Sequence, residues 1–243
     1  MYLKCTIGNV AWKCYRDEYE NVCATYANYL KNKRVVIVGP APSIDGSMQH
    51  DLIESYDVVV RVNEALPIPK GHEEDVGTRT DVLYHCMVEE RGRDFAALVD
   101  GWKLDFLCSA FPNKRWYVKD NLAFLDRKVA CPYRIVPGSL WRMLFKELHS
   151  TPNTGTTAML DLLNHDIKEL YITGFTFYQG GYSKRYKDGD DENACKDKMK
   201  TVVWLPELEH RQNIQLELLQ GLWCADQRIR VDAPLEKILG PRM

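Results

Sequence analysis

The sequence has no apolar run approaching the roughly 20 residues that a membrane-spanning helix needs. Residues 1–20 also lack the basic stretch and apolar core of a signal peptide. There is no basic excess either, because 32 Lys and Arg stand against 34 Asp and Glu, a formal net charge of −2. Proteins that bind DNA or RNA usually carry a large positive charge. We therefore expect a soluble cytoplasmic protein without a transmembrane segment, and no nucleic acid as a partner.

The cysteines form no C-x-x-C pair, which removes the usual support for a zinc ribbon or a redox motif. The eight of them are scattered at positions 5, 14, 23, 86, 108, 131, 195 and 224. We interpret them mainly as reduced thiols, as in a reducing compartment.

What is present is typical of a globular protein. Of the 243 residues, 45% are hydrophobic, 11% aromatic and 27% charged. The polar and aromatic stretch 1–33 predicts an N-terminal helical appendage, and 34–243 predicts a single domain. Within that domain, a run rich in Gly, Lys, Tyr and Asp predicts a lid loop over about 178–203.

Short β-branched runs alternate with helical segments along the domain. Such continuous apolar runs are typical of strands buried on both faces of a parallel sheet. Strands are predicted at 35–38, 57–62, 81–86, 106–108, 133–136, 169–174 and 229–231, and helices at 49–56, 88–100, 154–165 and 207–226. This alternation predicts an α/β fold with a doubly wound, mostly parallel, Rossmann-like sheet.

Polar and glycine-rich segments follow the predicted strands at the edge where open α/β sheets bind ligands. Gly39–Ser43 leaves the first strand, but it has neither the G-x-G-x-x-G nor the P-loop pattern, so it also fits an ordinary turn. Asn63 leaves the next strand and could donate its amide to a phosphate, or simply cap a turn. Asn153–Thr156 begins a helix, whose free N–H groups attract anions, although a plain N-cap would look the same.

The order and spacing of these segments resemble the sialyltransferases of animals, of glycosyltransferase family 29 type. The resemblance covers residues 34 to about 222. The matching segments are Val35–Gly39, Asp57–Ala65 and Glu74–Thr80 for the family's large motif, Pro152–Gly155 and Thr173–Phe175 for its small motif, and His210 with the helix that follows for its very small motif.

The resemblance implies an inverting, metal-independent transferase with a GT-A-variant fold. It would move sialic acid, or a related keto-acid sugar such as Kdo, from a CMP-sugar donor to a hydroxyl group of a glycan acceptor, with no further cofactor. His210 would be the catalytic base. The implied donor-binding residues are Gly39, Ala41, Ser43, Asn63, Asn153, Thr154, Gly155, Thr156, Gly174, Phe175, Thr176 and Tyr186.

The sequence departs from the family pattern at several positions. The two cysteines of the family disulfide correspond to Val35 and Ile167, and the first-strand Asn corresponds to Pro40. The Glu of the very small motif is Gln215, and Lys184–Tyr186 takes the place of the third motif. Two alternatives therefore stay open: a non-catalytic module that binds CMP or another nucleotide on the same fold, and a transferase that uses a UDP- or GDP-sugar.

The segment Asp188–Asp190 has the D-x-D form by which other glycosyltransferases bind a divalent cation. It lies in a Lys- and Gly-rich stretch and does not directly follow a buried strand. The resembled family works without metal. We therefore expect no metal at this place.

Overall fold

The structure is a computed structural model that describes residues 18–87, 99–112, 130–179, 181–183 and 210–242. Its centre is a seven-stranded sheet in the order β5-β4-β3-β2-β1-β6-β7, with every neighbouring pair parallel. The strands are β1 Arg34–Val38, β2 Val58–Val62, β3 Val82–His85, β4 Phe106–Ser109, β5 Tyr133–Ile135, β6 Glu169–Thr173 and β7 Ile229–Val231. The predicted doubly wound α/β fold is confirmed.

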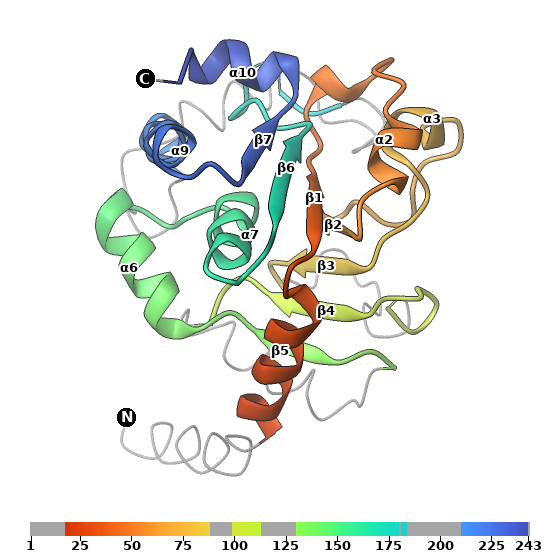
Figure 1. The fold of residues 1–243 in the computed structure, drawn as a ribbon, viewed down its shortest axis with the longest axis vertical. Helices are drawn as coiled ribbons and strands as arrows, with labels where there is room; N and C mark the ends of the chain where they lie inside the picture. The colour runs from red at the N-terminus through yellow and green to blue at the C-terminus, as the bar shows by residue number, and fades with distance from the viewer. Residues whose placement is uncertain (1–17, 88–98, 113–129, 180, 184–209, 243) are drawn as a thin grey trace.

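Helices cover both faces of this sheet. Figure 1 shows α6, α7 and α9 on one side and α2 and α3 on the other. The helices that lie wholly within the described residues are the 3-10 helix η1 Pro42–Ile44, α2 His50–Glu54, α3 Glu73–Val76, α6 Gly138–Leu148, α7 Thr154–Leu163, α9 Gln212–Ala225 and α10 Ala233–Leu239.

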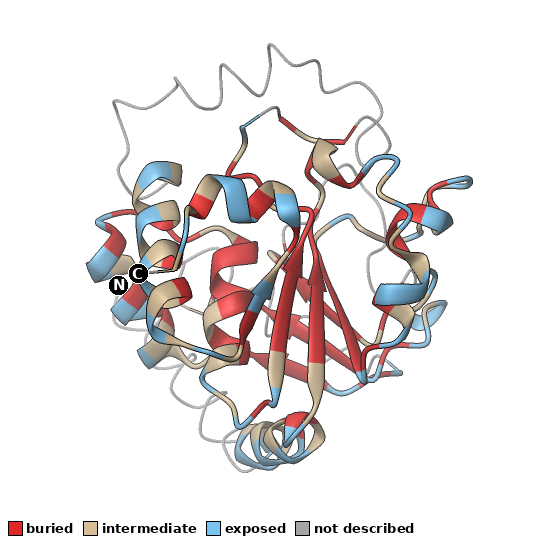
Figure 2. Ribbon diagram, turned by 45° about the horizontal axis from the view of Figure 1, so that its top comes forward, coloured by how far each residue is buried: buried red, intermediate tan, exposed pale blue. Residues whose placement is uncertain are grey.

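The strands are buried on both faces because each face meets a helical layer, as the red strands of Figure 2 show. In β1, Val35 and Ile37 belong to the larger core together with residues of α7 and α9. Val36 and Val38 point the opposite way and pack with Ile53 of α2. Alternate residues of one strand therefore serve two cores, which explains the unbroken β-branched run.

The strand order reverses at β1, which pairs with β2 on one side and with β6 on the other. Val36 lies beside Val59 of β2 and Tyr171 of β6. The carboxyl ends of these three strands therefore meet at one edge of the sheet. A reversal of this kind creates the crevice in which open α/β sheets bind their ligands.

The described part of the N-terminal segment packs onto this sheet. Residues 18–30 are helical, and Tyr26 and Leu30 are fully buried in the larger core. The Tyr26 hydroxyl lies 2.9 Å from that of Tyr84 on β3. The division into an appendage at 1–33 and one domain at 34–243 stays a prediction.

A buried ion pair joins α7 to the sheet. Arg134 of β5 donates from Nη1 and Nη2 to the two carboxylate oxygens of Asp161, at 2.5 and 3.0 Å, and both side chains are almost fully buried. The Tyr84 hydroxyl donates to the same carboxylate at 2.6 Å. Burial disfavours the charged guanidinium, but the adjacent carboxylate outweighs it and raises the pKa of Arg134.

Some helices differ from those predicted. The sequence analysis missed α6, although Trp141, Leu144 and Leu148 supply the buried stripe of an amphipathic helix. It also missed α10, which begins at Asp232, whose carboxylate accepts from the Leu235 N–H at 2.9 Å. Most of the helix expected at 88–100 and residues 207–209 of the one expected at 207–226 lie outside the described residues.

Over the described ranges, no helix combines the length and the apolar character that crossing a membrane requires. The five cysteines in these ranges, at positions 23, 86, 108, 131 and 224, are free thiols.

Candidate functional site

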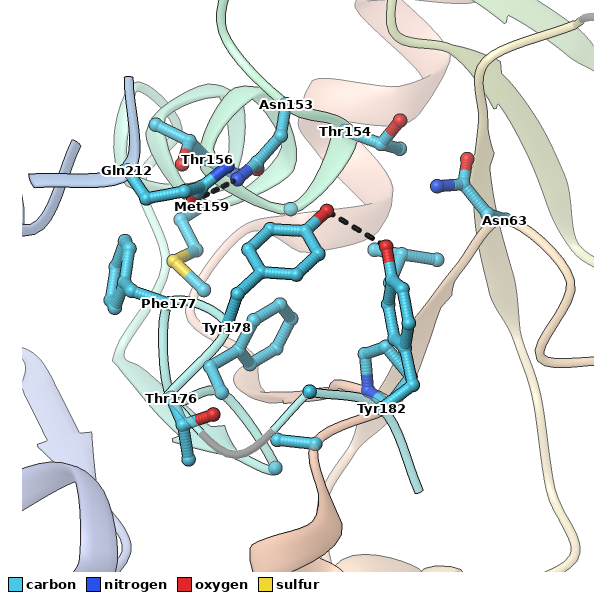
Figure 3. Close-up of a pocket in the computed structure, with 17 residues that line it drawn as sticks. Asn63, Asn153, Thr154, Thr156, Met159, Thr176, Phe177, Tyr178, Tyr182 and Gln212 are labelled. Carbon is cyan, nitrogen blue, oxygen red and sulfur yellow. Dashed lines mark hydrogen bonds between the residues drawn. The ribbon is translucent and has the colours of Figure 1, made fainter. Parts of the chain in front are cut away.

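A pocket lies at the carboxyl ends of β1, β2 and β6, where the strand order reverses (Figure 3). It spans about 580 Å³, part of which is open solvent. The lining residues are Pro40, Ala41, Val62, Asn63, Asn153, Thr154, Gly155, Thr156, Met159, Gly174, Phe175, Thr176, Phe177, Tyr178, Gly181, Tyr182 and Gln212.

The pocket brings together most of the residues singled out from the sequence. The predicted ones in its lining are Ala41, Asn63, Asn153, Thr154, Gly155, Thr156, Gly174, Phe175 and Thr176. Gly39, Ser43 and His210 are not part of this lining. Tyr186 lies outside the described residues, so its contact with a donor stays a prediction.

One end of the pocket is the N-terminus of α7. The Asn153 side chain caps this helix by accepting from the Thr156 N–H at 2.7 Å. Within the described ranges, no group accepts a hydrogen bond from the N–H of Thr154 or Gly155. These two donors, together with the helix dipole, favour an anion at this end of the pocket.

Asn63 presents an amide donor opposite that helix. Its backbone is left-handed, with φ of 51°, and its Oδ1 accepts from the Cys86 N–H at 3.1 Å. The bond to Cys86 orients the carboxamide, because its oxygen must face the Cys86 N–H and its nitrogen then faces the other way. Figure 3 shows the Asn63 nitrogen pointing into the pocket, where it can donate to a ligand.

Close backbone packing shapes the floor of the pocket. The Ala41 N–H donates to the Gly174 carbonyl, and the Gly39 N–H donates to that of Thr173, both at 2.8 Å. A Cβ at Gly39 would lie 2.3 Å from the Gly174 carbonyl oxygen and 2.7 Å from the Phe175 ring. Gly39 therefore lets the ends of β1 and β6 approach each other and leaves room for Phe175.

Two tyrosines that the sequence analysis did not include in the donor site close another side of the pocket. The Tyr182 hydroxyl donates to that of Tyr178 at 2.8 Å, and the rings meet edge to face. The neighbouring Ser183 is buried, with its N–H 2.7 Å from the Pro40 carbonyl and its hydroxyl 2.7 Å from Asp45 Oδ1. Residues 181–183, part of the segment expected to be a polar lid, thus pack firmly.

Helix α9 is attached to the cap of α7. The Asn153 backbone N–H donates to Gln215 Oε1 at 3.0 Å, and its side-chain amide donates to Gln212 Oε1 at 3.2 Å. Gln215 is fully buried. Hydrophobic periodicity favours Ile214 and Leu218 for the apolar face of this helix, but both are only partly buried. The stripe that faces the core is formed by Gln215, Leu219 and Trp223.

His210 lies just before α9 and is exposed. Its Nδ1 is 2.9 Å from the Thr151 carbonyl oxygen. Because a carbonyl oxygen only accepts, this bond requires the proton on Nδ1, which leaves the lone pair of the neutral ring on Nε2. Only Arg211 separates His210 from Gln212, which lines the pocket.

In the described part of the chain, no three His, Cys, Asp or Glu side chains are grouped as ligands for a metal ion. Asp188 and Asp190 lie outside it.

A model of glycosyltransferase family 29 (sialyltransferase) matches residues 19–91. Similar solved structures include a mammalian sialyltransferase in complex with Gal-beta-1-3GalNAc-ortho-nitrophenol, at 19% identity and a TM-score of 0.53, over 83% of this chain and 69% of that one. CstII from Campylobacter jejuni, with the substrate analogue CMP-3FNeuAc, matches at 15% identity with a TM-score of 0.56, over 83% of this chain and 82% of that one. The monofunctional alpha-2,3-sialyltransferase Cst-I from the same organism matches at 12% identity with a TM-score of 0.58, over 87% of this chain and 81% of that one. No curated protein sequence matches the chain.

The fold, with its pocket at the reversal of strand order, is Rossmann-like and similar to that of these sialyltransferases. The chain resembles sialyltransferases in its sequence over residues 19–91 and in its fold over most of its length. The predicted resemblance is confirmed.

Proposed function

We propose that the protein transfers sialic acid, or a related keto-acid sugar, from a CMP-sugar to a hydroxyl group of a glycan, with inversion and without a metal ion. The observation that carries this proposal is the convergence of the α7 N-terminus and Asn63 on one pocket. Support also comes from the similar CstII structures, which include complexes with CMP and with a trisaccharide acceptor and CMP.

The donor phosphate would lie between α7 and Asn63. It would accept from the N–H groups of Thr154 and Gly155 and from the Asn63 amide, with the Tyr178 and Tyr182 hydroxyls within the same pocket. A CMP leaving group carries a single phosphate, and neutral donors at a helix N-terminus can stabilise the charge that develops on it. Phe175 and Thr176 would line the nucleoside side.

His210 would be the general base. In the proposed step, Nε2 takes the proton from the acceptor hydroxyl while that oxygen bonds to the anomeric carbon. The bond between that carbon and the phosphate oxygen breaks, and CMP leaves with the electron pair. The Thr151 carbonyl holds Nδ1–H and so keeps the ring in the tautomer that the step requires.

The test is transfer by His210→Ala with CMP-sialic acid and a panel of glycan acceptors. Loss of a general base should lower kcat by roughly 10²- to 10⁴-fold and change CMP affinity little. His50→Ala is the matched control, because Nδ1 of His50 also contacts a backbone carbonyl, that of Glu73, at 3.1 Å on the other side of the sheet. Transfer by His210→Ala within a few-fold of the native rate would remove His210 from the mechanism.

The same assay separates the alternatives. A non-catalytic module would bind CMP but would not release CMP from CMP-sialic acid. An enzyme that uses a UDP- or GDP-sugar would bind UMP or GMP more tightly than CMP when the nucleotides compete for the pocket. We also retain the proposed contacts of Gly39, Ser43 and Tyr186 with the donor.

A cytoplasmic location is part of the proposal. Its support is that Val35 and Ile167, the counterparts of the family disulfide, are core residues. All eight thiols should then react after denaturation without a reductant.

A further inference from the structure

A second cavity lies next to the first one, at the carboxyl ends of β1 and β2. The two cavities share Pro40, but they use alternate residues of β2, since Val62 lines the first and Arg61 the second. The second cavity spans about 390 Å³, part of which is open solvent, and is lined by Val38, Gly39, Pro40, Arg61, Glu64, Ala65, Ile68, Pro69, His72, Val76 and Ser183. It therefore lies on the side of the sheet that carries α2 and α3.

Arg61 is 2% exposed, and neutral groups hold two of its three nitrogens. Its Nε donates to Thr80 Oγ1 at 2.9 Å, and its Nη2 donates to the Val76 carbonyl at 2.5 Å. Both nitrogens also approach the Arg79 carbonyl, at 3.3 and 3.2 Å. These bonds fasten segment 74–80 to β2. Among the described residues, none accepts a hydrogen bond from Nη1.

No described carboxylate forms an ion pair with this guanidinium. The acidic groups with the largest electrostatic influence on it, Glu54 and Asp81, have other partners. Glu54 accepts from the N–H groups of Thr78 and Arg79, and Asp81 pairs with the Arg79 side chain at 3.1 Å. Burial lowers the pKa of Arg61 to about 10, so it remains charged at neutral pH.

A buried cation without a counter-charge is costly, and here it borders a cavity. The rest of the lining limits which anion could compensate it. Glu64 borders the same space, and His72 is already 3.0 Å from the Asp45 carboxylate. Because Arg61 supplies one positive charge and acidic groups lie nearby, the cavity favours an anion with a single negative charge over a phosphate dianion. The Val38, Ala65, Ile68, Pro69 and Val76 side chains supply apolar walls.

We propose that this second cavity binds a small organic carboxylate, with its charged group on Arg61 and its apolar body against these walls. The inference does not depend on the proposed transferase activity, because Arg61 does not line the pocket proposed for the donor phosphate. A ligand here would also contact Ala65 and Glu64, on the segment between β2 and α3.

The test measures binding of benzoate, benzamide and inorganic phosphate to the full chain by calorimetry, up to millimolar concentrations. Benzamide has the shape of benzoate without its charge. We expect benzoate to bind at least tenfold more tightly than benzamide or phosphate. Equal binding of benzoate and benzamide, tighter binding of phosphate, or no binding of benzoate would overturn the proposal.

Two variants locate the site without disturbing the bonds of Arg61. Ala65→Phe should fill the cavity and weaken benzoate at least tenfold, and Glu64→Gln should tighten it roughly two- to fivefold by removing a nearby negative charge. CMP affinity and the unfolding temperature serve as controls for the first pocket and for folding. If both variants fold and bind benzoate with native affinity, the carboxylate lies elsewhere and the assignment is wrong.

Discussion

Gln215 accepts a hydrogen bond from the backbone N–H of Asn153, with its Oε1 3.0 Å from that nitrogen. The helix that follows His210 is thereby attached to the residue that caps α7 at the proposed phosphate site. By the resemblance, Gln215 stands in place of the Glu of the very small motif. In the structure it contacts the α7 cap, so it would position the donor pocket.

Gln215→Leu should therefore lower both stability and CMP affinity. It leaves the Asn153 backbone N–H unpaired at a partly buried position, which costs about 1 kcal/mol. Urea unfolding and CMP titration measure the two effects. The control is Gln220→Leu on the same helix, where Nε2 lies 3.5 Å from the nearest carbonyls, of Ile238 and Leu239. Equal effects of the two substitutions would argue against a special role for Gln215.

Gly39 and Gly221 should respond in opposite directions to alanine. At Gly39 the new Cβ would lie 2.3 Å from the Gly174 carbonyl oxygen, so we expect destabilisation by about 1 to 3 kcal/mol. Nothing lies within 4 Å of a Cβ at Gly221, in the interior of α9. Alanine there should stabilise by about 0.5 to 1 kcal/mol. Thermal unfolding compares them, and a shift of the same sign in both variants would contradict the proposed close packing at Gly39.

The ionised carboxylate of Glu54 should stabilise the folded protein at neutral pH, and this stabilisation should be lost at acidic pH. Partial burial raises its pKa, but hydrogen bonds from the Arg79 and Thr78 N–H groups outweigh burial and leave the pKa below its usual value. A carboxyl with a lowered pKa in the folded state stabilises above its unfolded pKa, and this effect is lost as pH falls through the folded pKa.

Glu54→Gln should consequently destabilise the protein at pH 7 by about 1 kcal/mol or less, because solvent screens this group. The difference from the native protein should shrink as pH falls through the lowered pKa of Glu54, in urea unfolding at a series of acidic pH values. Glu217→Gln, on the exposed face of α9, is the control. A difference that stays constant between pH 7 and pH 3 would show that the charge of Glu54 is irrelevant.

Transfer should continue in excess EDTA, because the proposed site uses neutral donors for a single phosphate. The measurement is the initial rate of CMP release before and after chelation. Loss of activity that Mn²⁺ alone restores would revive Asp188–Asp190 as a metal site.

The strands were predictable because burial on both faces demands unbroken apolar runs, as in Val35–Val38. Thr154 and Gly155 were predictable as site residues because a helix start after a short polar loop signals free N–H groups. The sequence did not place Tyr178 and Tyr182 in the donor site, since they adjoin a polar stretch that looked too hydrophilic to pack. Their positions follow from contacts near the end of β6 that only the folded chain defines.

The burial of Gln215 could not be predicted from the sequence either. Hydrophobic periodicity assigns a glutamine to the exposed face of a helix and favours Ile214 or Leu218 for the core. Its Oε1 accepts from the N–H of Asn153, which is distant in the sequence, whereas its buried Nε2 has no hydrogen-bond partner among the described residues. The cavity at Arg61 could not be predicted either, because the carbonyls that hold the guanidinium belong to a separate segment, 74–80.

We propose that the pocket between α7 and Asn63 binds the phosphate of CMP, and calorimetry of CMP with Asn63→Asp is the measurement that decides it. Aspartate can still accept from the Cys86 N–H, but it replaces the amide donor that faces the pocket with a negatively charged oxygen. Asn164→Asp, at the opposite end of α7, is the control. We predict that Asn63→Asp weakens CMP binding by about 2 kcal/mol or more, roughly 30-fold, while Asn164→Asp leaves it unchanged. Native CMP affinity in Asn63→Asp, or no CMP binding by the native protein, would contradict the account.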